Sequence, residues 1–196
     1  MLLVGSSNAN VGFADAMKIL RAGGSALDAV EVAIRAVEAN PLDHSVGFSG
    51  LPNILGEVEL DASIMDGRTL AAGSVCAMRN YEAAISIARA VMERLPHVLL
   101  AGAGAERFAQ ELGFATRDLL TPEARAIFEG KVGQGRNPRY ETMRELVMRA
   151  TTAADIAASV KDYHGTVNVI AVDGTGNIAS GVSTSGWAWK YPGRVG

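Results

Sequence analysis

A threonine near the C-terminal end of the chain has the surroundings of a nucleophile. Thr166 follows His164 and Gly165, and a second hydroxyl, Thr184, comes 18 residues later. A threonine hydroxyl at its ordinary pKa is a poor nucleophile, and its nearest possible base is its own α-amine, which exists only once the Gly165–Thr166 bond is cut. Arg194 follows in a turn, and a guanidinium can hold a carboxylate by two parallel hydrogen bonds. These residues predict a latent nucleophile with a tuning hydroxyl and a cation.

The segments around the two threonines predict a β-hairpin. Apolar runs at 166–172 and 178–184 flank the turn Asp173-Gly174-Thr175-Gly176-Asn177. Because the first strand starts and the second ends at the same edge of the sheet, we expect Thr166 and Thr184 to meet there. The almost continuous apolar character of 166–172 also predicts a strand buried on both faces.

The remaining elements must hold this hairpin in place. Apolar spacing predicts helices at 12–23, 25–39, 81–95, 105–112, from 121, 140–150 and 153–161, and strands at 1–5, 58–65, 71–77 and 98–101. Ser25, with Asp28 three residues on, is a good helix N-cap, and Thr121 is another. The stretch 42–56, rich in Gly, Ser, Pro and Asn, is expected to be a site loop. Together these elements predict one domain, a sheet covered by helices.

The composition excludes several classes of function. The 18 basic and 21 acidic residues give a net charge of -3 without a run of like charges, so a nucleic-acid partner is not expected. No apolar stretch approaches the roughly 20 residues of a membrane span, and no secretory signal begins the chain, so we expect neither membrane insertion nor export but a cytoplasmic protein. Cys76 is the only cysteine and is expected in the core; no imidazole or thiol lies at ligand spacing, so we expect neither metal nor cofactor.

Several segments, in this order, resemble glycosylasparaginases of the N-terminal-nucleophile asparaginase superfamily. They are Asp43-His44-Ser45-Val46-Gly47-Phe48, Leu60-Asp61-Ala62-Ser63-Ile64-Met65-Asp66-Gly67, His164-Gly165-Thr166, Ser183-Thr184-Ser185-Gly186 and Gly193-Arg194-Val195-Gly196. The resemblance covers nearly the whole chain and is weakest at 121–161. It implies an α+β fold, a four-layer αββα sandwich made as a precursor. Residues 1–165, with a linker at about 130–163, would form one part and residues 166–196 the start of the other; the full-length form would be a homodimer of processed units.

The resemblance also implies roles for the site residues. Thr166 would attack the Gly165 carbonyl, and hydrolysis of the resulting ester would free its amine. The hydroxyl would then attack the side-chain amide of asparagine or an N4-substituted asparagine and release aspartate, with Thr184 tuning it and Arg194 binding the α-carboxylate. Near the scissile bond, His164 is expected to have a loop or strain role rather than act as general base, and Ser45 is expected to be a hydroxyl packed by the nucleophile.

Three departures from the glycosylasparaginase pattern leave alternatives open. Gly165 replaces an aspartate, as in plant-type asparaginases and isoaspartyl peptidases, and Ser6-Ser7-Asn8 stands where a substrate-framing tryptophan is expected. The family continues after Gly196 with an aspartate for the substrate amine and a Thr-Gly oxyanion hole, so we expect a chain shortened at its C-terminus, with an incomplete sandwich. The alternatives are a plant-type L-asparaginase or isoaspartyl peptidase, and an inactive fragment that acts only by association.

Overall fold

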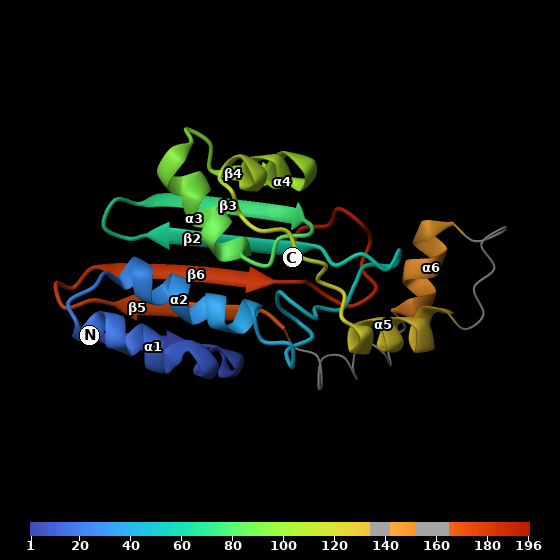
Figure 1. Ribbon diagram of the computed structural model, residues 1–196, viewed down its shortest axis with the longest axis horizontal. Coiled ribbons are helices and arrows are strands. Elements are labelled where there is room, and N and C mark those ends of the chain that lie inside the picture. The colour runs from blue at the N-terminus through green and yellow to red at the C-terminus, as the bar shows by residue number, and fades with distance from the viewer. Residues whose placement is uncertain (134–141, 152–164) are drawn as a thin grey trace.

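The computed structural model describes residues 1–133, 142–151 and 165–196, and its strands form one sheet (Figure 1). The strands are β1 (Leu2–Gly5), β2 (Leu60–Asp66), β3 (Ala71–Met78), β4 (Leu99–Ala101), β5 (Val167–Val172) and β6 (Ile178–Thr184). Among the described residues their order is β1-β5-β6-β2-β3-β4, antiparallel except for the parallel pair β3–β4. The predicted hairpin is β5–β6, and it lies inside the sheet between β1 and β2.

The helices agree closely with the sequence prediction. They are α1 (Asn10–Arg21), α2 (Ala26–Glu38), α3 (Ala84–Arg94), α4 (Gly102–Glu111), α5 (Pro122–Phe128) and α6 (Met143–Ala150), with a short 3₁₀ turn at Ser7–Ala9 and a π-helical turn at Glu129–Gly133. The helix predicted at 153–161 lies outside the described residues. No helix in the described part of the chain is both long and apolar enough to cross a membrane.

Side-chain caps explain where several helices begin. The Ser25 hydroxyl accepts the Asp28 N–H at 3.1 Å at the start of α2, and the Thr121 hydroxyl accepts the Ala124 N–H at 3.2 Å at the start of α5. Both predicted caps are confirmed. Such a bond satisfies one of the four N–H groups that a helix leaves unpaired at its first turn.

One face of the sheet is buried under α1, α2 and α3 (Figure 1). A row of paired residues across four strands, Val167, Ser183, Ala62 and Val75, is at most 5% exposed. The α1 and α2 helices pack so closely that a side chain at Gly12 would run into the Ala33 backbone. This layer forms the main core.

The other face of the sheet is uncovered in the described part of the chain. Val4, Ile170 and Met65 lie in one cross-strand row and are 52, 44 and 38% exposed. The prediction that 166–172 is buried on both faces is therefore wrong, because β5 alternates buried and exposed residues and only one face meets helices. The mixed α+β class is confirmed, but the described residues contain one sheet and no second sheet or outer helix layer of a four-layer sandwich.

A smaller core lies beyond the end of the sheet. Helices α5 and α6 pack there against Leu51, Ile54 and Trp189. The Phe128 ring lies 5.7 Å from that of Trp189. Although α6 falls within the expected linker at 130–163, it is thus attached to the loops that lead into the site.

Candidate active site

The predicted nucleophile and its partner lie at one end of the uncovered sheet face. Thr184 ends β6, directly opposite Asp61 of β2, and Thr166 precedes β5 on the same side. A cavity of about 570 Å³ opens there, lined by both threonines, Gly165, Lys190 and residues 6–8 near the N-terminus. The hairpin thus brings the two hydroxyls to a common cavity, as its length predicts.

The Thr184 hydroxyl contacts the bond that would have to break. It donates to the Gly165 carbonyl oxygen at 2.6 Å and accepts the Gly186 N–H at 2.8 Å. In this structure the hydroxyl polarises the Gly165 carbonyl, and its role in tuning the Thr166 hydroxyl stays a prediction. A donor on that oxygen stabilises the negative charge that forms when a nucleophile attacks the carbonyl carbon.

Ser45 packs directly on the other side of the same peptide bond. Any side chain at Gly165 would overlap the Ser45 side chain, and the Ser45 carbonyl accepts the Ser185 N–H at 2.8 Å. Asp43 orients Ser45, because its carboxylate accepts both the N–H and the hydroxyl of Ser45. The 42–56 segment is therefore a site loop, as predicted, and glycine at 165 is required by this packing.

Arg194 reaches the cavity but is already engaged. Its Nη1 donates to the Asp61 carboxylate at 2.6 Å, and its Nη2 donates to the carbonyls of Glu59, at 3.2 Å, and Ser185. The guanidinium packs on Gly186, where a side chain would collide with it. Three of its five N–H groups are thus used within the protein and the Nε–H is buried, so a substrate carboxylate can take two N–H groups only if it displaces a protein partner.

A second cation is buried beside Arg194. Lys190 is 6% exposed, and its ammonium donates to the Leu51 carbonyl. Burial, together with the charge of Arg194, holds the pKa of Lys190 well below its usual range, although Glu59 and Asp61 oppose this. Glu59 in turn accepts the Gly193 N–H at 3.0 Å. Two acids and two bases thus form a buried charge cluster at the floor of the site.

A buried acid lies behind the hairpin end, on the helix side of the sheet. The Glu38 carboxylate is fully buried and accepts the Ser183 hydroxyl at 2.7 Å and the Ile85 N–H at 2.8 Å. Burial raises the pKa of Glu38 to about 7, while these bonds and the Arg35 guanidinium act against the shift. Because Ser183 immediately precedes Thr184, Glu38 connects helices α2 and α3 to the site.

The structure brings most of the predicted site residues together. Gly165, Thr166 and Thr184 line one cavity with Arg194, and Ser45 lies against Gly165. His164 lies outside the described residues. Cys76 is buried, as expected of a core residue.

Three charged residues of the site, Asp43, Glu59 and Lys190, were not predicted from the sequence. The contact between Asp61 and Arg194 was not predicted either. A signal was available for Lys190, because it is a charge in a stretch otherwise made of aromatic and small residues. In the described ranges no three His, Cys, Asp or Glu side chains gather in a possible metal site.

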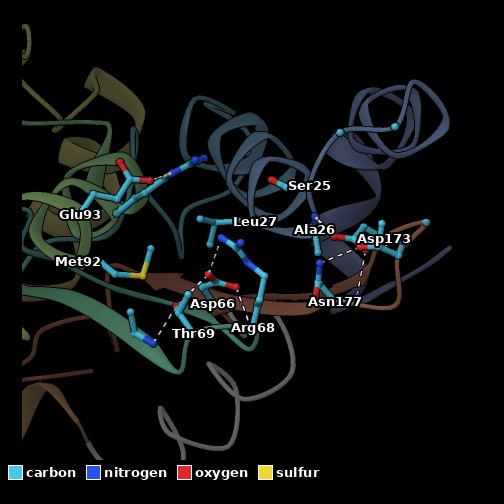
Figure 2. A pocket seen from close by; sticks show the side chains of 16 residues that line it. Ser25, Ala26, Leu27, Asp66, Arg68, Thr69, Met92, Glu93, Asp173 and Asn177 are labelled. Carbon is cyan, nitrogen blue, oxygen red and sulfur yellow. Dashed lines mark hydrogen bonds and ion pairs between the residues drawn. The ribbon is translucent and has the colours of Figure 1, made fainter.

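A larger cavity, of about 700 Å³, lies at the opposite end of the sheet (Figure 2). Its carboxylates have partners within the protein: Asp173 accepts the Thr175 hydroxyl at 2.7 Å and the Asn177 N–H at 3.0 Å, and Asp66 accepts the Thr69 hydroxyl at 2.9 Å. These bonds shape two turns. The smaller cavity, with the Thr184 hydroxyl on the Gly165 carbonyl, is therefore the better candidate for an active site.

Comparison with known proteins identifies relatives of this chain. The sequence pattern described as asparaginase matches residues 9–196. The chain is 40% identical over 182 residues to an N(4)-(beta-N-acetylglucosaminyl)-L-asparaginase of Elizabethkingia miricola, covering 93% of this chain and 48% of the relative. It is 38% identical over 179 residues to the mouse isoaspartyl peptidase/L-asparaginase, covering 91% and 50%. The rat N(4)-(beta-N-acetylglucosaminyl)-L-asparaginase is 36% identical over 194 residues, with 90% and 55% covered.

These matches define the class of protein and then the family. A helix-covered sheet with a threonine hydroxyl at a glycyl carbonyl fits the N-terminal-nucleophile hydrolases. The chain belongs to the asparaginase family. It spans about half the length of the curated relatives it matches.

Proposed function

We propose that the chain is the precursor form of an amidohydrolase that cuts its own Gly165–Thr166 bond and then hydrolyses the side-chain amide of asparagine or its derivatives. The observation that carries this proposal is the Thr184 hydroxyl at 2.6 Å from the Gly165 carbonyl oxygen. That bond polarises the carbonyl next to the proposed nucleophile, with Ser45 packed on the same peptide.

The first step is an acyl shift at this peptide bond. The Thr166 oxygen forms a bond to the Gly165 carbonyl carbon and the C–N bond breaks, so the glycyl group moves to oxygen and the amine is released. Water then hydrolyses the ester and regenerates the hydroxyl. The freed α-amine of Thr166 serves as general base for the second reaction. In that reaction the Thr166 hydroxyl forms a β-aspartyl ester, and the nitrogen of the substrate's side-chain amide leaves as an amine or as ammonia. Water then hydrolyses the ester and regenerates Thr166.

The substrate distinguishes two forms of the proposal. Glycosylasparaginases and isoaspartyl peptidases match the chain at nearly the same identity. The leading proposal is the glycosylasparaginase type. The alternative, a plant-type asparaginase or isoaspartyl peptidase, is favoured by Gly165, the form of that position in those enzymes, and by Ser7, where glycosylasparaginases carry a substrate-framing tryptophan.

We also propose that the uncovered sheet face packs against a second sheet in the complete fold. The row containing Val4, Ile170 and Met65 supports this proposal, because isolated sheets do not normally leave such a row in water. A four-layer αββα sandwich would bury it.

Cleavage is tested by incubating the purified chain and following its mass. We expect two fragments that meet between Gly165 and Thr166. Thr166→Ala should abolish scission and Thr166→Ser should retain it, since the hydroxyl is kept. Thr184→Val should slow it about 10²–10³-fold, the usual effect of losing one oxyanion donor. A chain that stays intact after long incubation would contradict the self-cleavage proposal.

Hydrolysis is tested with three substrates: asparagine, a β-aspartyl dipeptide and N4-glycosylated asparagine. If aspartate is released fastest from the glycosylated compound, the glycosylasparaginase type is supported. If it is released fastest from the dipeptide, the alternative is supported. If none of the three is hydrolysed after the chain has been cleaved, the amidohydrolase proposal is wrong, and a fragment acting only by association is favoured. Thr116→Ala, a change at an exposed loop residue that does not line the cavity, serves as the matched control.

A further inference from the structure

Asp61 is the point at which three segments of the site converge. The residue is 5% exposed and lies in β2, opposite Thr184. Its Oδ1 accepts the Ala77 N–H at 2.8 Å, and its Oδ2 accepts Arg194 Nη1 at 2.6 Å and the Gly196 N–H at 2.9 Å. One buried carboxylate therefore connects β2, the strand paired with β6 and Thr184, to β3 and to the 193–196 turn.

The backbone around Asp61 departs from regular strand geometry. The β2–β3 register shifts between Leu60 and Ala62, so two residues of β3 oppose Asp61 alone. One of them, Ala77, has a φ of +48°, a left-handed conformation that residues with a side chain rarely adopt. Such a bulge re-aims a side chain, and strain of this kind persists only where neighbouring contacts hold it. Here the Ala77 N–H bond to Asp61 is such a contact.

The guanidinium of Arg194 is held from two sides. Asp61 binds one end, and Gly186 supports its plane, while the Gly186 N–H itself binds the Thr184 hydroxyl. The Arg194 Nε is buried and has no hydrogen-bond partner among the described residues. The Arg194 guanidinium is thus oriented by protein groups, and Gly186 connects its position to that of the Thr184 hydroxyl.

We propose that Asp61 is a positioning residue, which holds the Arg194 guanidinium and the 193–196 turn beside Thr184 before any carboxylate substrate binds. The inference rests on the proposed function only for the role of Arg194 as a substrate-binding cation. Holding a charged group in place beforehand removes the cost of ordering it when the ligand arrives. Asp61 also offsets the charge of Arg194, so that the buried cluster stays balanced with no ligand present.

The proposal is tested by the reactivity of Arg194 toward phenylglyoxal in the whole chain, followed by peptide mass mapping without substrate. In Asp61→Asn we expect Arg194 to react roughly tenfold faster, as expected when one charge-assisted hydrogen bond is lost. Arg79 and Arg117 in the same digest serve as internal references. The matched control is Asp66→Asn, at the far end of β2, where the carboxylate lies near Arg68; it should leave Arg194 unchanged.

The outcomes separate positioning from a general structural role. If Asp61→Asn accelerates all three arginines equally, or leaves Arg194 at the wild-type rate, the proposal is overturned. Asp61→Glu keeps the charge, and should restore part of the protection. Because no substrate is used, a chain that fails to hydrolyse any substrate counts against the proposed function and leaves this measurement valid.

A second measurement covers the case in which Asp61→Asn does not fold. Arg194→Met and the double variant Asp61→Asn/Arg194→Met are compared by thermal unfolding. Breaking a buried ion pair from one side is far more damaging than replacing both partners. We expect the double variant to fold and to melt at or above Arg194→Met alone, because Arg194→Met leaves the Asp61 carboxylate buried without its partner; a double variant that melts well below Arg194→Met would refute the pairing.

Discussion

Glu38 should make the stability of the protein depend on pH in the direction opposite to that of most carboxylates. Its side chain is fully buried between α2, α3 and β6, and burial raises its pKa from 4.5 to about 7. In the unfolded chain the group loses its proton at about pH 4.5, whereas the folded protein retains the proton to about pH 7. The folded state therefore binds more protons in this window, and the free energy of unfolding falls as the pH rises through it.

The size of the effect follows from the shift. A change in pKa from 4.5 to about 7 corresponds to about 3 kcal/mol of unfolding free energy lost across the window. Above about pH 7 the loss levels off, because both states are then ionised. Glu38→Gln has nearly the same shape and no charge, and its amide oxygen can still accept the Ile85 N–H, so the variant should lack this slope.

The assay is urea unfolding, followed by circular dichroism at several values from about pH 4.5 to about pH 8. The difference in unfolding free energy between wild type and Glu38→Gln should change by about 3 kcal/mol over that range, with the variant gaining relative to wild type as the pH rises. Glu93→Gln, at a half-exposed carboxylate of α3, is the control and should follow wild type. A pH-independent difference between wild type and Glu38→Gln would refute the reasoning.

Three further predictions concern packing and turns. Gly165→Ala should slow cleavage in the mass assay, because its methyl group would overlap Ser45, and adding Ser45→Gly should partly restore the rate; equal rates in all three chains would contradict this. Gly12→Ala should lower the urea-derived stability by about 1–3 kcal/mol, because its methyl group would run into the Ala33 backbone, and an unchanged midpoint would show that the helices can separate freely. Hydrogen bonds from Thr175, the Asn177 N–H and α2 lower the pKa of Asp173 to about 2. The contribution of Asp173 to the urea-derived free energy of unfolding should therefore be lost as the pH falls from 3.8 to about 2. Asp173→Asn should lack this contribution at every pH.

The local elements were predictable because short-range patterns specify them. The caps at Ser25 and Thr121, the hairpin turn after Val172 and the apolar spacing of the helices all act over a few residues. The meeting of Thr166 and Thr184 followed from strand length alone. The exposure of one face of β5 could not be predicted, because an apolar strand has the same sequence pattern whether one of its faces or both are covered.

The family and the candidate nucleophile could be predicted from the sequence, because both depend on residue types and their order along the chain. The atomic contacts within the site could not be predicted, because they depend on strand order and register across the sheet. Placing β2 beside β6 sets Asp61 opposite Thr184 and in contact with Arg194, a residue 133 positions away. The same arrangement puts the Thr184 hydroxyl on the Gly165 carbonyl and Glu38 behind Ser183. Contacts at such separations depend on how whole layers pack, and no pattern within a short window of sequence records them.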